Sequence, residues 1–283
     1  IILPLGEVRI TKKIKSILII FRTNTNVEIW DQNKRRLFEQ PKIEYSLRSL
    51  NSLLKSIKFT KTKYPNINFK ILIVDDKSEE KNLDKLNSII DNYALDISII
   101  PLDHQKYKNI IKPQKNDQTF SNLASLLQSF ELGRNHGEDL IFFVEDDYLH
   151  FEPMMEEMIA SYERIASQFD KEIFMCPADY PYLYSNIENT KIFYGNQRHW
   201  RIIKETLVTF LTSKNMIKKY LNDLKMMGQI RHHPFELKLH KIYEKEFCLS
   251  PIPSLAMHVT NINSIYGLPP NFDWKKIWDE NEI

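Results

Sequence analysis

The chain has 283 residues, of which 42% are hydrophobic and 27% charged, and its formal net charge at pH 7 is +2. This composition is typical of a soluble globular protein with a large core and excludes an intrinsically disordered chain. The balanced charge gives no support for nucleic acid as a partner, and no apolar run approaches the roughly 20 residues that a membrane-spanning helix requires.

The two cysteines, Cys176 and Cys248, are far apart and match no metal-ligand spacing. Buried free thiols in a reducing compartment are therefore expected, with a single disulfide as the alternative. We expect a cytoplasmic protein, which could also associate with the inner face of a membrane through basic surfaces. The sequence begins at Ile1 rather than Met, so we expect that a preceding segment was removed or left out.

Four short apolar runs in the first half predict strands, at 16–21, 69–76, 95–102 and 139–147. Apolar residues spaced mostly by three predict helices between them, over 45–57, 83–93 and 119–135. Ser121 and Asn122 are expected to cap the third helix, and Gly133 to stop it. Strands that alternate with helices predict βαβ units and a mostly parallel sheet, and the lack of polar alternation predicts that helices cover both faces.

The second half has a less regular pattern, which is typical of an α+β arrangement. Helices are predicted over 152–169, 213–227 and 234–247, and strands over 172–177 and 205–211. Neither an internal repeat nor a Gly/Ser linker separates the halves. The fold class is therefore α/β, and we expect a single domain over 1–283 with two halves, at about 14–150 and about 151–283.

Acidic residues follow two of the predicted strands. Asp75 and Asp76 end "ILIVDD", and Glu145, Asp146 and Asp147 end "IFFVEDD". Ligands of open α/β sheets bind beyond the carboxyl ends of the strands, and clustered carboxylates repel one another, so we expect a divalent cation to hold them. Mg²⁺ and Mn²⁺ prefer carboxylate oxygen and often share one or two carboxylates with substrate phosphates. The alternative is that acids end these strands only because loops are solvated.

Four segments in this order resemble the nucleotide-sugar half of glycosyltransferases with the GT-A fold. They are "IIFRTNTN", "ILIVDDKSEE", "SNLASLLQSFELGRN" and "LIFFVEDDYLHFEP". The resemblance implies a Rossmann-like, mostly parallel central sheet flanked by helices, followed by an α+β half that binds the acceptor.

The resemblance also implies roles for the strand ends. The first strand end would touch the nucleoside, the acids after the second strand would meet the base or ribose, and the acids after the later strand would hold the metal and the donor sugar. The residues so assigned to the nucleotide sugar are Arg22, Thr23, Asp75, Asp76, Glu145 and Asp146. Asp147, the last acid of a Glu-Asp-Asp variant of the Asp-x-Asp motif, is the expected direct metal ligand.

A histidine far downstream completes the predicted metal site. The stretch "PSLAMHVTNINSIYG", 253–267, resembles the Pro-Ser-Leu-x-x-His segment that closes many GT-A domains, where the histidine ligates the metal or meets the diphosphate. His258 would be that residue. Asp147 and His258 on one cation give a mixed oxygen and nitrogen shell, which suits Mn²⁺ better than Mg²⁺. The alternative is a histidine satisfied within the core.

An inverting transfer also needs a general base near the acceptor hydroxyl. The family pattern has an acid pair at the start of a helix before the final histidine, whereas this chain has "RHHPFELKLHKIYEK". Glu236 is the first candidate, His233 the second and Asp179 the third. The alternative for Glu236 is an acid favoured in a first helical turn by the helix dipole, and a retaining enzyme would need no such base.

Together these features predict a metal-dependent glycosyltransferase. It would move a sugar from a nucleoside diphosphate sugar to a saccharide, lipid-linked or protein acceptor, as in polysaccharide biosynthesis. A nucleotidyltransferase that makes nucleotide sugars, and a non-catalytic carbohydrate- or protein-binding module, are the alternatives. The first alternative is disfavoured because "FRTNTNVEIW", after the first strand, contains no glycine.

Overall fold

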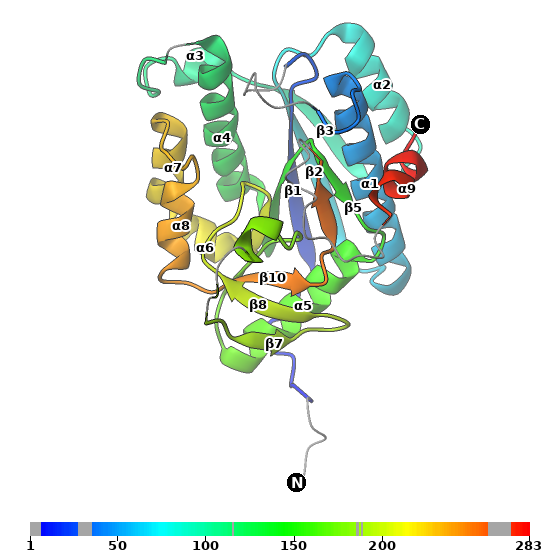
Figure 1. Cartoon of the computed structure of the whole chain (residues 1–283), viewed down its shortest axis with the longest axis vertical. Coiled ribbons are helices and arrows are strands. Elements are labelled where there is room, and N and C mark those ends of the chain that lie inside the picture. The colour runs from blue at the N-terminus through cyan, green and yellow to red at the C-terminus, as the bar shows by residue number, and fades with distance from the viewer. Residues whose placement is uncertain (1–6, 28–35, 115, 185–186, 188, 260–272) are drawn as a thin grey trace.

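The computed structural model describes residues 7–27, 36–114, 116–184, 187, 189–259 and 273–283. Within these residues the main sheet has nine strands, in the order β3-β2-β1-β4-β9-β6-β10-β8-β7, and a separate ribbon pairs β11 with β5. Helices lie on both sides of the main sheet (Figure 1). The α/β fold class predicted from the sequence is confirmed.

The first half of the chain builds the parallel part of the sheet. Its strands are β1 (Ser16–Thr23), β2 (Asn68–Asp75), β3 (Asp96–Pro101) and β4 (Leu140–Glu145). The connecting helices are α1 (Lys42–Lys63), α2 (Glu80–Ile90), α3 (His104–Tyr107) and α4 (Asp117–His136). β1 pairs in parallel with both β2 and β4, and β2 pairs in parallel with β3. The βαβ units predicted from alternating strands and helices are confirmed.

The rest of the chain adds strands that pair mostly antiparallel, together with more helices. Its strands are β5 (Tyr148–His150), β6 (Phe174–Met175), β7 (Ile192–Tyr194), β8 (His199–Ile203), β9 (Phe210–Ser213), β10 (Cys248–Ile252) and β11 (Ala256–His258). Its helices are α5 (Met154–Phe169), a 3₁₀ turn (Pro181–Tyr184), α6 (Lys214–Lys219), α7 (Leu221–Gln229), α8 (Leu237–Tyr243) and α9 (Trp274–Glu280). β9 pairs antiparallel with both β4 and β6, so one sheet runs through both halves.

Two apolar cores fill the space on either side of the sheet. Alternate residues of β1 enter opposite cores, since Ile17, Ile19 and Phe21 belong to one and Leu18 and Ile20 to the other. The first core also contains apolar residues of α1, α2 and α5. The second contains those of α4, α6, α7 and α8. Burial on both faces explains why these strands lack polar alternation.

The connections of β1 and β4 leave the sheet on opposite faces. α1, which follows β1, packs in the first core, whereas α4, which precedes β4, packs in the second. The chain therefore has a topological switch point between these two neighbouring strands. In open α/β sheets such a point forms a crevice outside the carboxyl ends of the strands, and that crevice is where ligands bind.

The caps predicted for α4 are wrong. The helix begins at Asp117, and its N-cap is Asn116, whose side chain accepts a hydrogen bond of 2.8 Å from the backbone N–H of Thr119. Ser121 and Asn122 lie inside the first turns of the helix. Asn116 offers the capping oxygen three residues ahead of an unpaired N–H, which explains why it takes this position.

The stop predicted at Gly133 is also wrong, because α4 continues to His136. The glycine is explained by packing. A Cβ atom at this position would lie 2.9 Å from the Phe143 ring of β4, closer than real Cβ contacts. Gly133 therefore lets the helix approach the sheet rather than ending it.

The second half was predicted less well. The helix expected over 213–227 is divided into α6 and α7 at Tyr220, and the helix expected over 234–247 is only α8. β7, β8 and β10 were not predicted. β10 contains Pro251, which disfavours a strand in sequence but is accommodated opposite Trp200 of β8.

Cys176 and Cys248 are buried free thiols, as the sequence predicted. Burial raises the pKa of Cys176 to about 12, so this thiol is un-ionised at neutral pH. Of the helices in the described ranges, none is both long and apolar enough to cross a bilayer.

Candidate active site

A solvent-open cavity of about 220 Å³ lies at the switch point between β1 and β4. Its wall is made by the ends of these strands, the start of α1 and the first half of α4. The lining residues are Arg22, Thr23, Asn24, Val27, Arg36, Lys42, Asp76, Gln118, Ser121, Asn122, Ser125, Asp146 and Asp147. Of the eleven residues predicted from sequence, five therefore line this cavity: Arg22, Thr23, Asp76, Asp146 and Asp147.

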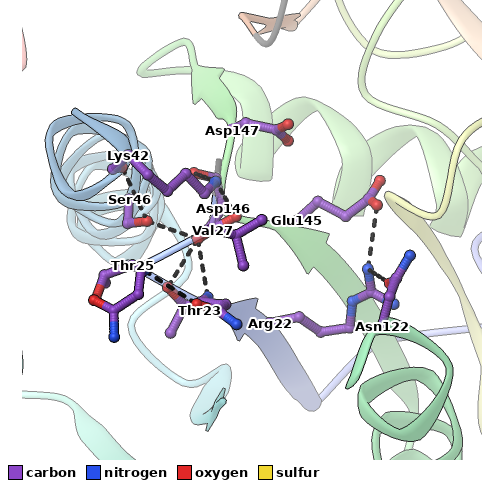
Figure 2. A network of polar contacts seen from close by, with 12 residues as sticks. Arg22, Thr23, Thr25, Val27, Lys42, Ser46, Asn122, Glu145, Asp146 and Asp147 are labelled. Carbon is purple, nitrogen blue, oxygen red and sulfur yellow. Dashed lines mark hydrogen bonds and ion pairs between the residues drawn. The ribbon is translucent and has the colours of Figure 1, made fainter. Parts of the chain in front are cut away.

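The three acids after β4 point in different directions (Figure 2). Asp146 points to α1, where its Oδ1 accepts a hydrogen bond of 2.5 Å from Lys42 Nζ and its Oδ2 one of 2.6 Å from Ser46 Oγ. Thr23 Oγ1 donates a further bond of 2.8 Å to the same Oδ2 atom. Both oxygens of this buried carboxylate are thus occupied, and Asp146 ties the end of β4 to β1 and α1.

Glu145 points the other way, toward α4. Its Oε1 lies 3.2 Å from Nη2 of Arg22, which also donates to Asn122 Oδ1 at 3.4 Å. Thr209 Oγ1 accepts the backbone N–H of Glu145 at 3.1 Å. Burial raises the pKa of Glu145, and the positive charge of Arg22 opposes that rise. The guanidinium group of Arg22, a residue of β1, therefore lies between the end of β4 and α4.

Asp147 meets His258. The Asp147 Oδ2 and His258 Nε2 atoms are 3.2 Å apart. The two-stranded ribbon brings them together, because His258 of β11 pairs with Tyr148 of β5 and the N–H of Val259 donates to the Asp147 carbonyl at 2.8 Å. Burial would lower the pKa of His258, but the carboxylates of Asp147 and Glu145 outweigh it and raise that pKa.

The acids after β2 have two different environments. Asp75 is folded into its own loop, where Ser78 donates its backbone N–H at 3.0 Å and its hydroxyl at 2.5 Å. Asp76 reaches the cavity and accepts a bond of 2.8 Å from Asn24 Nδ2, while its Oδ1 lies 2.6 Å from His104 Nε2. Burial raises the pKa of Asp75, which does not line the cavity. Asp76 therefore offers the ligand-facing carboxylate of this pair.

Of the three predicted bases, Glu236 is the one whose pKa is raised by the charge of Glu145. Burial and the negative charge of Glu145 raise its pKa to about 7, while the charges of His258 and Arg22 oppose the rise. It occupies the N-cap position of α8, one residue before the expected first turn, but its side chain makes no capping hydrogen bond. The geometry thus does not use this carboxylate to cap the helix.

His233 and Asp179 have other surroundings. His233 is exposed on the loop before α8. Asp179 is half-buried, forms an ion pair of 2.7 Å with Arg201 and also accepts the hydroxyl of Tyr184, whose ring stacks on the Arg201 guanidinium. Its carboxylate is therefore already engaged by two donors of the protein.

Several side chains in or next to the cavity were not predicted. Lys42 lines the cavity from the first turn of α1, which the sequence placed only from Tyr45 onward, so no pattern marked it. Ser46 lies within the predicted helix and holds Asp146 without lining the cavity. Gln118, Ser121, Asn122 and Ser125 recur on one face of α4 at spacings of three or four, and this polar stripe was a signal that the sequence did contain. His104 begins the basic stretch 104–115, where charge alone gave no reason to single it out.

Asp147 and His258, the two residues that the sequence predicted as metal ligands, lie next to each other. In the part of the chain that the structure describes, no group of three or more His, Cys, Asp or Glu side chains is arranged to hold a metal ion. Asp147 and His258 converge as one oxygen and one nitrogen donor. Such a pair fits a divalent cation that completes its shell with substrate phosphates and water.

The order of these features along the sheet identifies the architecture. A parallel layer carries acids at the ends of its second and fourth strands, an Asp-x-Asp-like motif follows β4, and a histidine from the last strand of the second half returns beside that motif. The chain has a GT-A-like fold.

Solved structures with a similar fold are glycosyltransferases and a nucleotidyltransferase. TarS 1-349 of S. aureus in complex with UDP matches with a TM-score of 0.41 and 12% identity, over 76% of this chain and 55% of that one. The galactosyltransferase LgtC with donor and acceptor sugar analogs matches with a TM-score of 0.39 and 11% identity, over 93% and 94%. UDP-glucose pyrophosphorylase complexed with UDP-glucose matches with a TM-score of 0.45 and 8% identity, over 89% and 95%.

This chain spans about half the length of the TarS 1-349 chains that it matches, at 48% of one and 55% of another. At these low identities the likeness is one of fold alone. No protein-family model matches the sequence, and no curated protein matches it.

Proposed function

We propose that this chain is a glycosyltransferase that takes a sugar from a nucleoside diphosphate donor, with the first half binding the donor and the second half the acceptor. The observation that carries the proposal is the contact between Asp147 and His258 at the edge of the switch-point cavity. The charges of Glu145 and His258 also act on the pKa of Glu236. A metal-type pair and a carboxyl group poised near neutral pH are the two chemical elements that an inverting transfer needs.

The nucleoside end of the donor would lie against β2 and the loop after β1. Asp76 is held by Asn24 and His104, so its carboxylate has a defined orientation toward the cavity. A carboxylate accepts hydrogen bonds and therefore suits the N–H groups of a base or the hydroxyl groups of a ribose. Asp75 supports this loop through Ser78 and is proposed to act through it rather than by contact.

The diphosphate would lie between the cations of the cavity and the Asp147–His258 pair. Arg36 lines the wall near Val27, and Lys42 lies beside Asp146. Asp147 and His258 are the residues proposed to hold Mn²⁺ or Mg²⁺. When bound, this ion would act as a Lewis acid that stabilises the charge developing on the leaving nucleoside diphosphate.

Arg22 is proposed to meet the sugar end rather than the nucleoside. Its guanidinium lies beside Glu145 and Asn122, whereas Asp76 is held by Asn24 and His104. Among the residues that the structure describes, its Nε and Nη1 atoms have no hydrogen-bond partner, so three N–H groups remain for ligand oxygens. Arginine presents its donors in a fixed planar fork, which is well suited to holding hydroxyl or phosphate oxygens.

Glu236 is proposed as the general base that takes the proton of the acceptor hydroxyl. A pKa of about 7 leaves a substantial fraction ionised at neutral pH while keeping the carboxylate more basic than an ordinary glutamate. His233 and Asp179 become lower-ranking candidates, because the first is exposed and the second is held by Arg201. The acceptor class would be a saccharide, a lipid-linked sugar or a protein.

A thermal-shift panel tests the proposal directly. Purified protein is heated with UDP-, GDP-, CMP- and dTDP-sugars, with and without MnCl₂, and donor hydrolysis is measured in parallel. We expect one nucleotide to stabilise the protein, more strongly with Mn²⁺, and to turn over. Asp147→Asn should abolish the Mn²⁺-dependent shift, whereas Asp223→Asn, on the exposed face of α7, should keep it.

The other outcomes identify the alternatives. Stabilisation by none of the nucleotides, with no turnover, would favour a binding module. Release of pyrophosphate from a nucleoside triphosphate and a sugar 1-phosphate would favour a nucleotidyltransferase.

A further inference from the structure

Helix α9 packs its buried tryptophan, Trp278, against Phe38 and Tyr45. Trp278 is 4% exposed. Its ring stacks on Phe38 with a centroid distance of 3.9 Å and an interplanar angle of 15°, and lies 4.7 Å from the Tyr45 ring of α1. A buried aromatic group of this size makes many contacts at once, so it fixes whatever packs against it.

Backbone contacts hold α9 on α1. Arg48 donates from Nη1 to the Trp278 carbonyl at 3.2 Å, and its guanidinium lies 4.6 Å from the Trp278 ring. Lys55 Nζ donates to the Glu280 carbonyl at 2.6 Å. These bonds satisfy carbonyl groups at the end of α9 and give the helix a defined position. Figure 1 shows α9 lying against α1.

The first connection from Trp278 leads to the cavity wall. Phe38, the residue stacked on Trp278, donates its backbone N–H to the Tyr45 hydroxyl at 2.8 Å. Two residues earlier, the Arg36 guanidinium lies 5.3 Å from the Tyr45 ring and donates to the Val27 carbonyl at 2.7 Å. Arg36 and Val27 both line the cavity. Phe38 and Tyr45 therefore transmit the position of Trp278 to Arg36.

The second connection leads to the Asp147–His258 pair. Trp278 and Tyr45 form one buried cluster with Leu149, Met257 and Val259. Leu149 lies two residues after Asp147 in β5, and Met257 immediately precedes His258 in β11. The same indole thus supports the ribbon that aligns the pair.

We propose that Trp278 is a positioning residue for the diphosphate-binding part of the site. Trp278 is absent from the cavity lining, yet it supports Arg36 on one side and the Asp147–His258 ribbon on the other. Asp76, which belongs to the proposed nucleoside end, is held by Asn24 and His104 rather than by Phe38, Tyr45 or the ribbon. This inference rests on the proposed function, because it assumes that the cavity binds a nucleoside diphosphate.

The division between the two ends gives a selective readout. Removing the indole leaves a void into which Phe38, Tyr45 and the ribbon relax, so Arg36 and the Asp147–His258 pair lose their alignment. Affinity for a nucleoside diphosphate should fall, whereas affinity for the matching nucleoside should not. A merely destabilising change would lower the folded fraction and affect both ligands equally.

The experiment compares four variants with the wild type. UDP, GDP and dTDP are titrated calorimetrically in MnCl₂, and uridine, guanosine and thymidine by ligand-observed NMR, well below each unfolding temperature. Changes acting through packed neighbours shift binding by roughly threefold to thirtyfold, and we expect this loss of diphosphate affinity in Trp278→Ala. Trp278→Phe should restore most of it. Phe38→Ala, at a partly buried position, should reproduce it with a smaller effect on stability.

Trp200→Ala is the matched control. Trp200 of β8 is also buried, but it bonds to Glu157 and Ser161 and belongs to the first core rather than to the Trp278 cluster. It should lower stability without changing the affinity of the folded protein. Unchanged diphosphate affinity in both Trp278→Ala and Phe38→Ala would overturn the inference, as would an equal loss of nucleoside affinity. If the wild type binds none of the nucleotides, the proposed function itself fails.

Discussion

His258 Nε2 lies 3.2 Å from Asp147 Oδ2, although the two residues are 111 positions apart in the sequence. The antiparallel pairing of β5 with β11 fixes this distance, because His258 stands opposite Tyr148. These half-buried carboxylate and imidazole groups stabilise each other when the histidine is protonated, and the same two groups are the proposed metal donors. The pair is therefore the most informative point at which to test the site.

Asp147→Asn is expected to lower donor turnover by at least about a hundredfold, since removing a principal charge-stabilising group at a reacting centre has effects of that size. The amide keeps the shape of the side chain but is a poorer metal ligand. Binding of Mn²⁺ with inorganic pyrophosphate, followed by calorimetry, should be lost as well. Wild-type turnover in this variant would exclude Asp147 from the site.

Asp76→Asn should distinguish binding at the nucleoside end of the donor from binding at its diphosphate end. We expect nucleotide affinity to fall by roughly tenfold to a hundredfold, because the amide can no longer accept two hydrogen bonds at fixed oxygens. Binding of Mn²⁺-pyrophosphate should stay at the wild-type level. Calorimetric titration of both ligands measures this, and a parallel loss of pyrophosphate binding would place Asp76 elsewhere in the site.

Glu236→Gln should remove the ascending limb of the pH–rate profile. Glu236 has a pKa of about 7, so its ionised, proton-accepting form grows as pH rises through 7. We expect kcat/KM of the wild type to increase between pH 6 and 8, and the variant to retain a small, flat residual rate. Glu244→Gln, at the exposed C-terminal end of α8, is the control and should keep the wild-type profile.

The same substitution should change how stability depends on pH. The pKa of Glu236 is raised in the fold from 4.5 to about 7, so the folded state holds the proton more tightly than the unfolded state. Its contribution to the free energy of unfolding is full below pH 4.5 and is lost as pH rises through 7. The free energy of unfolding of Glu236→Gln, relative to that of the wild type, should therefore rise by about 2 kcal/mol between pH 4 and pH 8. This value is smaller than the full linkage value because the group is partly exposed. Urea denaturation at each pH measures the difference. A constant difference would contradict the raised pKa.

Lys42→Met should destabilise the protein by about 3 kcal/mol, because removing one partner leaves a buried carboxylate without its counter-charge. Lys42 Nζ lies 2.5 Å from Asp146 Oδ1, and both side chains are nearly buried. Lys58→Met, on the exposed side of α1, should have little effect. Urea midpoints of the two variants give the comparison, and equal midpoints would mean that Ser46 and Thr23 suffice for Asp146.

The first half of the fold was predictable because its strands are buried on both faces and its helices are long. A continuous apolar run such as "SILIIF" has few alternatives in such a pattern, and β1 indeed covers Ser16–Thr23. The second half was not, because β6 and β7 are only two and three residues long. Strands of that length are defined by their neighbours in the sheet, and no local periodicity records them.

Of the candidate site, the sequence contained the strand-end acids and the distant histidine. It did not contain the direction of each carboxylate. Asp75 and Asp76 are adjacent in the chain, yet one completes a turn with Ser78 and the other meets the cavity. Lys42 and Asn24 match no motif in the sequence, and only the packing of α1 beside β1 brings them to the same cavity.

The anchoring of Asp146 by Lys42, Ser46 and Thr23 has a consequence for any survey of inactive variants. A variant that lacks the Asp146 carboxylate would lose the contacts that join the end of β4 to β1 and α1. Any loss of activity in that variant could be misread as the loss of a group that contacts the substrate. It would instead follow from displacement of the turn that carries Asp147.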